Sequence, residues 1–432
     1  MKPDLIFTIV TKNYLPLSNI LGDSIKMNHP DSDYVVIVAD HMGNDDLSTI
    51  INHDFLSVNV LGISNILSMT FKYNLTEFCT ALKPKCFEYL LSLGYQKIVY
   101  LDPDIYVYSS LESIFNDLNN FSICITPHLL YPEIPYTGFW AQGAILASGV
   151  YNLGFIGLKN SENSKSFLSW WAQNLEDFCF IEKSEGLFTD QKWLDFCPVF
   201  FPDIIIYREL GVNVALWNIH ERIIDYSNGE YFVKRRDGVD NSTLSKLKFV
   251  HFSNFNFTRA KDFEQFIPFT LDVYSDFIPL VDFYRNKLIE YDFIRICRSY
   301  KYEYNFFCNG VSVNKIHRRL YRKLLESNYI FDNPFSVEIN SFYMLLKKNK
   351  LVTNTDVNID VIDDKGDTGF SNKFELIKFF SKFLIRIMGI KRYTFLCRFS
   401  LWFFKYENQI FLLKEFESKI EIKKPSPYIN LK

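Results

Sequence analysis

Strand-like and helix-like segments alternate along roughly the first 250 residues of the chain. Short apolar runs bounded by polar turns are typical of buried strands, and longer segments with apolar residues three and four apart are typical of helices. The expected strands are 5–10, 34–39, 97–101, 122–126, a glycine-containing strand region within 144–158, and 248–252, and the expected helices are 17–27, 75–93 and 164–179. This alternation predicts an α/β layered fold.

The pattern changes in the rest of the chain. From about Arg259 the alternation stops and helical patterns dominate, and a polar, acidic segment of the kind found in flexible linkers follows. The predicted regions are a sheet domain 1–258, a helical C-terminal subdomain 259–350, an acidic flexible linker 351–372 and a basic amphipathic helical tail 373–432. More than one structural unit is expected, because 432 residues exceed what one ordinary core holds.

The tail places basic and large apolar side chains on adjoining positions of a helix. Lys378, Lys382 and Arg386 recur four residues apart, and Phe379 and Phe383 lie beside them. An amphipathic basic helix of this kind suits an interfacial membrane anchor. It equally suits a helix that docks on the rest of the protein or on a second subunit, and periodicity alone does not separate the two.

Composition excludes several classes of protein. The formal net charge of −3 gives no global basic field for nucleic acid, and the eight cysteines include no Cys-x-x-Cys pair of the kind found in zinc ribbons. The first apolar run, 5–10, is too short for a signal sequence, and no run approaches the ~18 apolar residues of a spanning helix. We therefore expect a cytoplasmic protein with reduced thiols, with peripheral contact at the cytoplasmic face of an inner membrane as an option left open by the tail.

An Asp-Pro-Asp sequence ends the strand expected at 97–101. Pro103 cannot donate to the strand ladder, so Asp102 and Asp104 are expected at the exposed strand end. Two carboxylates this close are costly unless a positive charge lies between them. Mg²⁺ and Mn²⁺ prefer such oxygen ligands and often complete their coordination with substrate phosphates. An isolated Asp-x-Asp is more often a solvated turn, so its neighbours in the sequence decide between the two interpretations.

Those neighbours resemble a known group of enzymes. Four blocks occur in the order and rough spacing of glycosyltransferases with a GT-A fold, in particular family 8 and its bacterial polysaccharide relatives. The blocks are Ile98–Asp104, Tyr151–Phe155, Asp190–Gln191 and His251–Ser253. Each block alone is a weak signal, whereas four in order, over about residues 5 to 255, are a strong one.

The resemblance implies a metal and a reacting centre. It makes region 1–258 a GT-A nucleotide-sugar-binding catalytic domain with a Rossmann-like mixed sheet and flanking helices. In this domain it implies that Asp102, Asp104 and His251 bind Mn²⁺ or Mg²⁺. It also implies that Asp190 and Gln191 lie near the anomeric carbon of the donor sugar, where they stabilise positive charge. The same Asp190 is suited to capping the helix that follows it, which is a common structural role for Asp.

The resemblance also suggests residues that contact the donor. Lys83 occupies the place of a cationic residue beside the diphosphate, with Lys85 as the candidate in a shifted register. A solvated helix lysine is the alternative for either position. Asn152 resembles an amide that contacts sugar hydroxyls, and Trp217 lies in a later loop-like stretch where its ring offers a stacking surface for a sugar.

A nucleoside pocket is expected where the first two strands end. Thr11 and Asn13 follow the first strand and Asp40 follows the second, and ligands of open α/β sheets bind beyond the carboxyl ends of strands. For Thr11 and Asn13 a role in the turn is the alternative. Two positions depart from the family pattern. Ser253 lies two residues after His251, where a glycine is usual, and Lys192 follows Gln191, where an aspartate is usual.

The sequence therefore predicts a metal-dependent, hexosyltransferase-like glycosyltransferase. It would move a sugar from a nucleotide diphosphate donor, a UDP-sugar by resemblance, to a bacterial surface glycan such as an O-antigen or capsule, or to its lipid-linked precursor, with retention of configuration. A sugar-nucleotide nucleotidyltransferase is an alternative, although residues 11–16 lack the glycine-rich loop that this reaction favours. A non-catalytic scaffold of a polysaccharide-assembly complex is a third.

Overall fold

The computed structural model describes residues 4–41, 46–238, 244–253, 255, 271–352 and 368–420. The chain forms two compact units. The first contains Met1–Ser64 and Leu75–Tyr302, and the second contains Asn65–Asn74 and Glu303–Lys432. The division falls after Tyr302, so two helices of the region predicted at 259–350 belong to the sheet unit.

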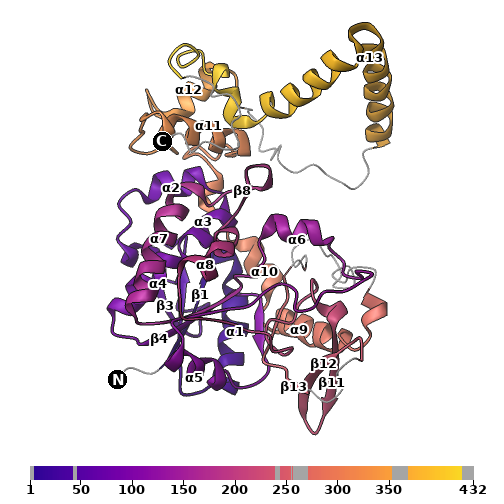
Figure 1. Ribbon diagram of the computed structural model, residues 1–432. Coiled ribbons are helices and arrows are strands. Elements are labelled where there is room, and N and C mark those ends of the chain that lie inside the picture. The colour runs from indigo at the N-terminus through magenta and orange to yellow at the C-terminus, as the bar shows by residue number, and fades with distance from the viewer. Residues whose placement is uncertain are drawn as a thin grey trace. The chain divides into compact units, whose positions relative to one another are not determined.

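A seven-stranded mixed sheet forms the centre of the first unit (Figure 1). Its strand order is β10-β6-β7-β4-β1-β2-β3, and β7 alone among these strands runs antiparallel to its neighbours. The strands are β1 (Leu5–Val10), β2 (Asp33–Val38), β3 (Asp54–Ser57), β4 (Lys97–Leu101), β6 (Ile123–Ile125), β7 (Phe155–Lys159) and β10 (Ile204–Ile206). The predicted α/β class with a mixed sheet is confirmed.

Helices cover both faces of this sheet because its inner strands are apolar on both sides. On β1, Ile6 and Val10 pack in one core cluster with Leu21 of α1, while Phe7 meets Phe87 of α4 edge to face at 4.8 Å. Figure 1 shows α1 on one side of the sheet and α4 with α7 on the other. The helices of this unit are α1 (Leu15–Asn28), α3 (Leu75–Ala81), α4 (Lys83–Ser92), α5 (Glu112–Asn120), α6 (Gln142–Ser148), α7 (Glu162–Phe178), α8 (Cys197–Phe200), α9 (Ile278–Glu290) and α10 (Phe293–Ser299).

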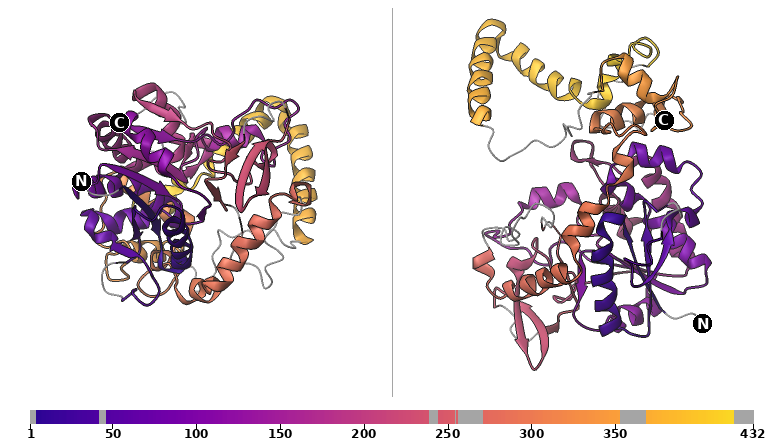
Figure 2. Two further views of the ribbon diagram at one scale, coloured as in Figure 1. Left: turned by 90° about the horizontal axis from the view of Figure 1, so that it is seen from below. Right: turned by 180° about the vertical axis from the view of Figure 1, so that it is seen from behind.

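Small sheets complete the unit. The strands β5 (Ile105–Val107) and β14 (Phe249–His251) form an antiparallel pair beside the main sheet. A hairpin of β11 (Arg222–Ser227) and β12 (Glu230–Arg235), extended by β13 (Ser245–Lys246), projects from the unit in Figures 1 and 2. A further pair joins β8 (Ile181–Glu182) and β9 (Leu187–Phe188). The strand predicted at 248–252 is therefore present, but it pairs with β5.

The strand region predicted within 144–158 is half wrong. Its second half is β7, whereas its first half lies in helix α6. Gly149 ends that helix, because its N–H donates to the carbonyl of Ile145 and its φ of 115° suits glycine. The glycine that suggested a strand irregularity thus marks a helix end. The helix predicted at 75–93 is divided in two, since α3 and α4 are separate and Pro84 lies in the first turn of α4.

The second unit is helical, as predicted for the C-terminal region. It contains α2 (Ile66–Lys72), α11 (Lys315–Glu326), α12 (Phe342–Lys348) and α13 (Thr368–Phe403). Phe71 of α2 packs against Tyr321 and Phe342, and the guanidinium of Arg318 donates to the carbonyls of Thr70, Phe71 and Tyr73. Basic residues of α11 are therefore part of this core.

The tail forms a long helix with one bend. Helix α13 changes direction at Gly389, where φ is 72° (Figure 2). None of the described helices combines the length and apolarity that crossing a membrane requires. Most of the predicted acidic linker, residues 353–367, lies outside the described residues, as do residues 421–432 of the predicted tail.

Candidate active site

The Asp-Pro-Asp sequence and a distant histidine meet at the end of β4. Asp102 follows the last residue of β4, and its N–H donates to the carbonyl of Gly154 over 2.8 Å. Beyond Asp104 the chain enters β5, whose first residue, Ile105, lies opposite His251 of β14. One ligand atom from each of Asp102, Asp104 and His251 lies within 4.8 Å of the others. Pairing of β5 with β14 thus brings together residues almost 150 positions apart.

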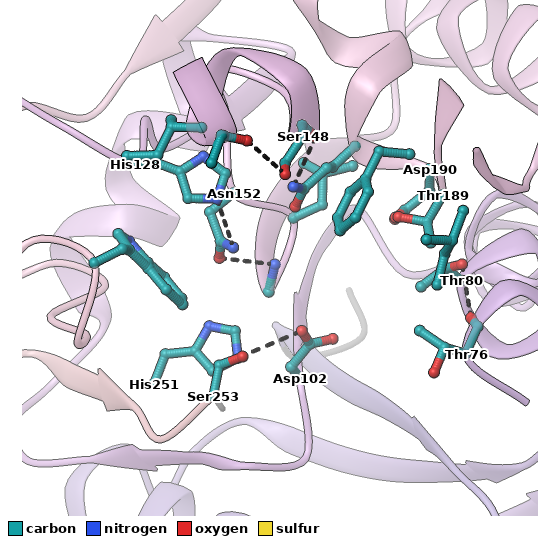
Figure 3. A pocket seen from close by; sticks show the side chains of 18 of the residues that line it. Thr76, Thr80, Asp102, His128, Ser148, Asn152, Thr189, Asp190, His251 and Ser253 are labelled. Carbon is teal, nitrogen blue, oxygen red and sulfur yellow. Dashed lines mark hydrogen bonds and ion pairs between the residues drawn. The ribbon is translucent and has the colours of Figure 1, made fainter. Parts of the chain in front are cut away.

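These three side chains fit a divalent cation. His251 Nε2 lies 3.0 Å from Asp104 Oδ1 and 3.6 Å from Asp102 Oδ2, and the two carboxylates remain partly accessible. Figure 3 shows the imidazole of His251 beside Asp102. Burial alone would lower the pKa of His251, but Asp104 and Asp102 outweigh it and raise that pKa. The cluster therefore favours positive charge, and two carboxylates with one imidazole are a donor set that divalent metals accept.

A glycine makes room for the histidine. A Cβ at position 154 would lie 2.3 Å from Cε1 of His251, which is far inside contact distance. Gly154 also donates its N–H to Oδ1 of Asn152 over 3.1 Å. The Asn-x-Gly block noticed in the sequence therefore sets the position of His251 as well as that of Asn152.

A buried ion pair adjoins the metal-ligand cluster. Nζ of Lys83 lies 2.8 Å from Oδ2 of Asp190 and 3.8 Å from Oδ1 of Asp102, and both Lys83 and Asp190 are only 2% exposed. The ammonium also donates to the carbonyl of Leu153 over 2.7 Å and lies 4.4 Å from the ring centre of Tyr100. Lys83 thus lies between Asp102, predicted as a metal ligand, and Asp190, predicted to lie at the reacting centre.

The electrostatics of this pair are governed by burial and by mutual attraction. Burial alone would lower the pKa of Lys83, but the carboxylates of Asp190 and Asp102 outweigh it and raise that pKa. Burial raises the pKa of Asp190, and Lys83 opposes that rise. Each partner therefore depends on the other to stay charged in this dry setting.

The geometry decides two alternatives that the sequence left open. Lys85 is exposed and pairs with Glu88 over 2.7 Å, so Lys83 is the lysine beside the carboxylates. Asp190 occupies the position before the 3₁₀ helix Gln191–Phe196, yet its side chain makes no capping hydrogen bond. Its carboxylate contacts Lys83 instead.

One cavity of about 510 Å³ joins these groups; we call it the Asp102 cavity (Figure 3). Lys83, Asp102, Asp190 and His251 line it, together with side chains from α6 and from loops. The predicted site residues that line it are Lys83, Asp102, Asn152, Asp190, Gln191 and His251. Gln191 also donates to the carbonyl of Ser148 over 2.9 Å, which fixes its amide against the end of α6.

Sequence reasoning missed His128. It lines the Asp102 cavity, and its Nε2 lies 3.3 Å from the amide nitrogen of Asn152. Burial lowers the pKa of His128 to about 4, so the ring is neutral at neutral pH. Its position two residues after Thr126, just beyond β6, was the available signal, because strand ends gather at one edge of the sheet.

Trp217 also lines the cavity, as its loop position suggested. Its ring meets those of His128 and His251 edge to face, at 5.3 and 5.2 Å between ring centres. The indole therefore packs between the metal-ligand cluster and the polar group formed by His128 and Asn152. Whether it stacks on a sugar stays a prediction.

The residues predicted for the nucleoside lie at the expected strand ends. The hydroxyl of Thr11 donates to Asn13 over 2.6 Å, and the N–H of Lys12 donates to Asp40 over 2.9 Å. None of Thr11, Asn13 and Asp40 belongs to the described lining of the Asp102 cavity. Their contact with a nucleoside stays a prediction.

Two relatives from Bacillus subtilis (strain 168) align with the chain. Uncharacterized protein YfnF is 24% identical over 284 residues, which is 63% of this chain and 90% of YfnF. Uncharacterized protein YfnD is 26% identical over 191 residues, which is 43% of this chain and 56% of YfnD. No protein-family profile matches the chain.

Solved glycosyltransferase structures overlap the chain at low identity. The galactosyltransferase LgtC in complex with donor and acceptor sugar analogs is 15% identical, with 66% of this chain and all of LgtC covered and a TM-score of 0.35. Mouse xyloside xylosyltransferase 1 is 10% identical, with 59% of this chain and 98% of that chain covered and a TM-score of 0.35. The residues of the site, rather than these overlaps, carry the functional argument.

Proposed function

We propose that the protein is a metal-dependent glycosyltransferase that moves a sugar from a UDP-sugar to a bacterial surface glycan or its lipid-linked precursor. One observation supports this most strongly. The metal-ligand cluster of Asp102, Asp104 and His251 lies next to the buried pair of Lys83 and Asp190. A nucleotide diphosphate donor needs positive charge at its diphosphate and a negative or polar group near the sugar carbon that reacts.

Mn²⁺ or Mg²⁺ held by Asp102, Asp104 and His251 would act as a Lewis acid for the charge that the departing diphosphate gains. Lys83 would add a second positive charge at the same place, since its ammonium lies 3.8 Å from Asp102. Because Lys83 is buried and held by Leu153 and Asp190, little side-chain freedom remains to be lost when the donor binds.

In the reaction, the bond between the sugar C1 and the diphosphate oxygen breaks, and its electron pair stays on that oxygen. The acceptor hydroxyl oxygen forms the new bond to C1, and its proton passes to the departing diphosphate oxygen. Asp190 and Gln191 would stabilise the positive charge that C1 develops, on the face where retention of configuration requires it. Asn152 would bind sugar hydroxyls, and Thr11, Asn13 and Asp40 would bind the nucleoside.

Release of UDP tests this proposal directly. Purified protein is incubated with Mn²⁺ and, separately, with UDP-glucose, UDP-galactose and UDP-N-acetylglucosamine, and UDP is measured. We expect slow hydrolysis of at least one donor, which EDTA stops and added Mn²⁺ restores. Release of pyrophosphate from UTP and a sugar phosphate would indicate the nucleotidyltransferase alternative, and the absence of both reactions would indicate a scaffold.

We further propose that α13 attaches the enzyme to an anionic lipid surface. Phe379, Phe383 and Ile387 are 65%, 51% and 67% exposed, and the cations Lys378 and Arg386 lie among them. Large apolar side chains flanked by cations enter the interface of anionic membranes, with each cation adding about 1 kcal/mol. A protein of a glycan-assembly complex is the other partner that this surface suits.

A further inference from the structure

A second cavity of about 390 Å³ lies in the first unit; we call it the His220 cavity. It lies between the segment 131–137 and the residues at the far end of β12, and it shares no lining residue with the Asp102 cavity. Glu133, His220 and Arg235 contribute polar groups to it. The function proposed above assigns no role to these groups.

His220 is buried without a hydrogen bond. Its side chain is 1% exposed, and among the described residues neither ring nitrogen has a hydrogen-bond partner. The closest carboxylate oxygen, on Glu133, is 3.5 Å from Nε2, longer than the roughly 2.7–3.2 Å of a well-formed hydrogen bond. The hydroxyl of Tyr136, whose ring packs edge to face on the imidazole at 5.2 Å, is also buried and unpartnered. Unpaired buried polar groups are rare because they cost stability.

Neighbouring polar groups in this region form their hydrogen bonds within the protein. The carboxylate of Glu221 accepts from the N–H groups of Leu130 and Tyr131, both over 3.0 Å, and from Arg222 over 2.8 Å. Arg236 donates to Asp276 over 2.8 Å. Among the described residues of this region, the groups without a hydrogen-bond partner are therefore the imidazole of His220 and the hydroxyl of Tyr136. This suggests a ligand that forms the missing hydrogen bonds.

The polar groups favour a hydroxyl-rich ligand over an ion. Burial lowers the pKa of His220, so at neutral pH the ring offers one N–H donor and one nitrogen acceptor. A hydroxyl group donates and accepts, and it can use both. Most of the charged groups of the cavity are already in ion pairs and so attract an ion less, since Arg235 pairs with Asp237, Arg236 with Asp276 and Glu221 with Arg222. The charged residues that line it are Glu133, Glu221, Arg235, Arg236 and Asp237.

The two cavities are neighbours along the chain. His128 and Trp140 line the Asp102 cavity, and the segment 131–137 between them lines the His220 cavity. Trp217 lines the first cavity, and His220, three residues later, lines the second. Two segments, 128–140 and 217–220, therefore contribute lining residues to both cavities.

We propose that the His220 cavity binds a sugar unit of the acceptor glycan, one that lies beyond the hydroxyl that reacts. This inference rests on the proposed glycosyltransferase function. The volume lies within the range of roughly 300–1,000 Å³ usual for small-molecule sites. Glu133 and His220 would form hydrogen bonds with the hydroxyls of this sugar, and the imidazole would thereby gain the partners that it lacks among the described residues.

Saturation-transfer NMR tests the cavity with free sugars as probes. Methyl glycosides of glucose, galactose, mannose and N-acetylglucosamine are added in millimolar excess to the full-length protein. We expect saturation transfer to at least one of them, and at least a fivefold weaker signal with His220→Phe. No signal with any of the four, or an equal signal with the variant, would overturn the proposal.

Melting temperature separates a ligand role from a structural one. His220→Phe removes two unsatisfied nitrogens and keeps a ring against Tyr136, so its melting temperature should equal or exceed that of the wild type. The matched control is His53→Phe, because His53 bonds Asp23 over 2.9 Å. This control should melt lower and keep the sugar signal. A lower melting temperature for His220→Phe with an unchanged sugar signal would contradict the proposal.

A second variant guards against overpacking at the site. His220→Ala removes the imidazole without adding volume and should also weaken the sugar signal at least fivefold. Failure of both variants to fold would overturn the proposal, because the imidazole would then be a structural requirement. The sugar signal should persist in EDTA, where UDP release stops. Absence of UDP release by the wild type in the presence of Mn²⁺ therefore refutes the proposed function, whereas absence of the sugar signal refutes the subsite.

Discussion

The Asp102 cavity and the His220 cavity bury polar groups in opposite ways. In the first, Lys83 and Asp190 form an ion pair over 2.8 Å. In the second, His220 is neutral, but neither of its nitrogens is bonded within the described residues. The difference indicates which ligand each site binds. The Asp102 cavity suits a charged ligand that interacts with the ion pair, and the His220 cavity suits a neutral ligand that supplies the missing hydrogen bonds.

The largest effect is expected from the metal ligands. Asp104→Asn keeps the size of the side chain but removes one of the few charged ligands, so UDP release should fall roughly 100-fold or more, beyond the 10–100-fold typical of residues that only support a ligand. Circular dichroism and melting temperature check that the fold is intact. An active Asp104→Asn enzyme that is also insensitive to EDTA would remove the metal from the account.

Breaking the buried ion pair should cost the most stability. Lys83→Met leaves the carboxyl of Asp190 buried without its cation, and the free energy of unfolding in urea should fall by about 3–5 kcal/mol. The double variant Lys83→Met with Asp190→Leu should recover most of that loss, since both charges are gone. This is the reverse of His220→Phe, which should cost nothing. Equal stability of Lys83→Met and wild type would show that the two sites do not differ as described.

Asp190 should matter more for turnover than for binding. Asp190→Asn keeps polarity but removes the negative charge, and kcat should fall about 10²–10³-fold, equivalent to about 2–4 kcal/mol, with a smaller change in the donor KM. Kinetics and melting temperature are measured on the same preparation. A destabilised variant with normal kcat would assign Asp190 to structure alone.

The smallest effect is expected in the tail. Replacing Lys378 and Lys382 by Gln should weaken binding to vesicles containing 30% anionic lipid by about 1 kcal/mol per residue, and added salt should remove the difference. Vesicle sedimentation measures it. The matched control is Lys165→Gln with Lys85→Gln, two exposed lysines of the first unit. Equal loss in the control would indicate a nonspecific charge effect.

The sequence predicted those parts of the site that follow strand ends. Asp102 and Asp104 could be placed because Pro103 ends a strand, and His251 because it lies near the end of another. The choice between Lys83 and Lys85 could not be made, because one residue of helical register turns a side chain by about 100° and only packing against Leu153 decides it. Residues 144–148 were assigned to a strand although they form α6, since a short apolar run has no distinguishing period.

The His220 cavity had no signal in the sequence. Its residues come from the segment 131–137, from the turn just before β11 and from the end of β12, and the paths of such loops depend on contacts with distant segments. His128 was overlooked for a related reason. A lone histidine is usually structural, and only its contact with Asn152 in the Asp102 cavity distinguishes it.

Binding of Mn²⁺ in the presence of UDP tests the central claim most directly. Free Mn²⁺ gives a sharp electron paramagnetic resonance signal that disappears on binding, so a titration counts sites and gives a Kd. We predict one site per chain in the wild type, tighter with UDP than without it, and loss of that site in both Asp102→Asn and His251→Ala. An unchanged Mn²⁺ affinity in those two variants, or no response to UDP, would contradict a metal and diphosphate site at the end of β4.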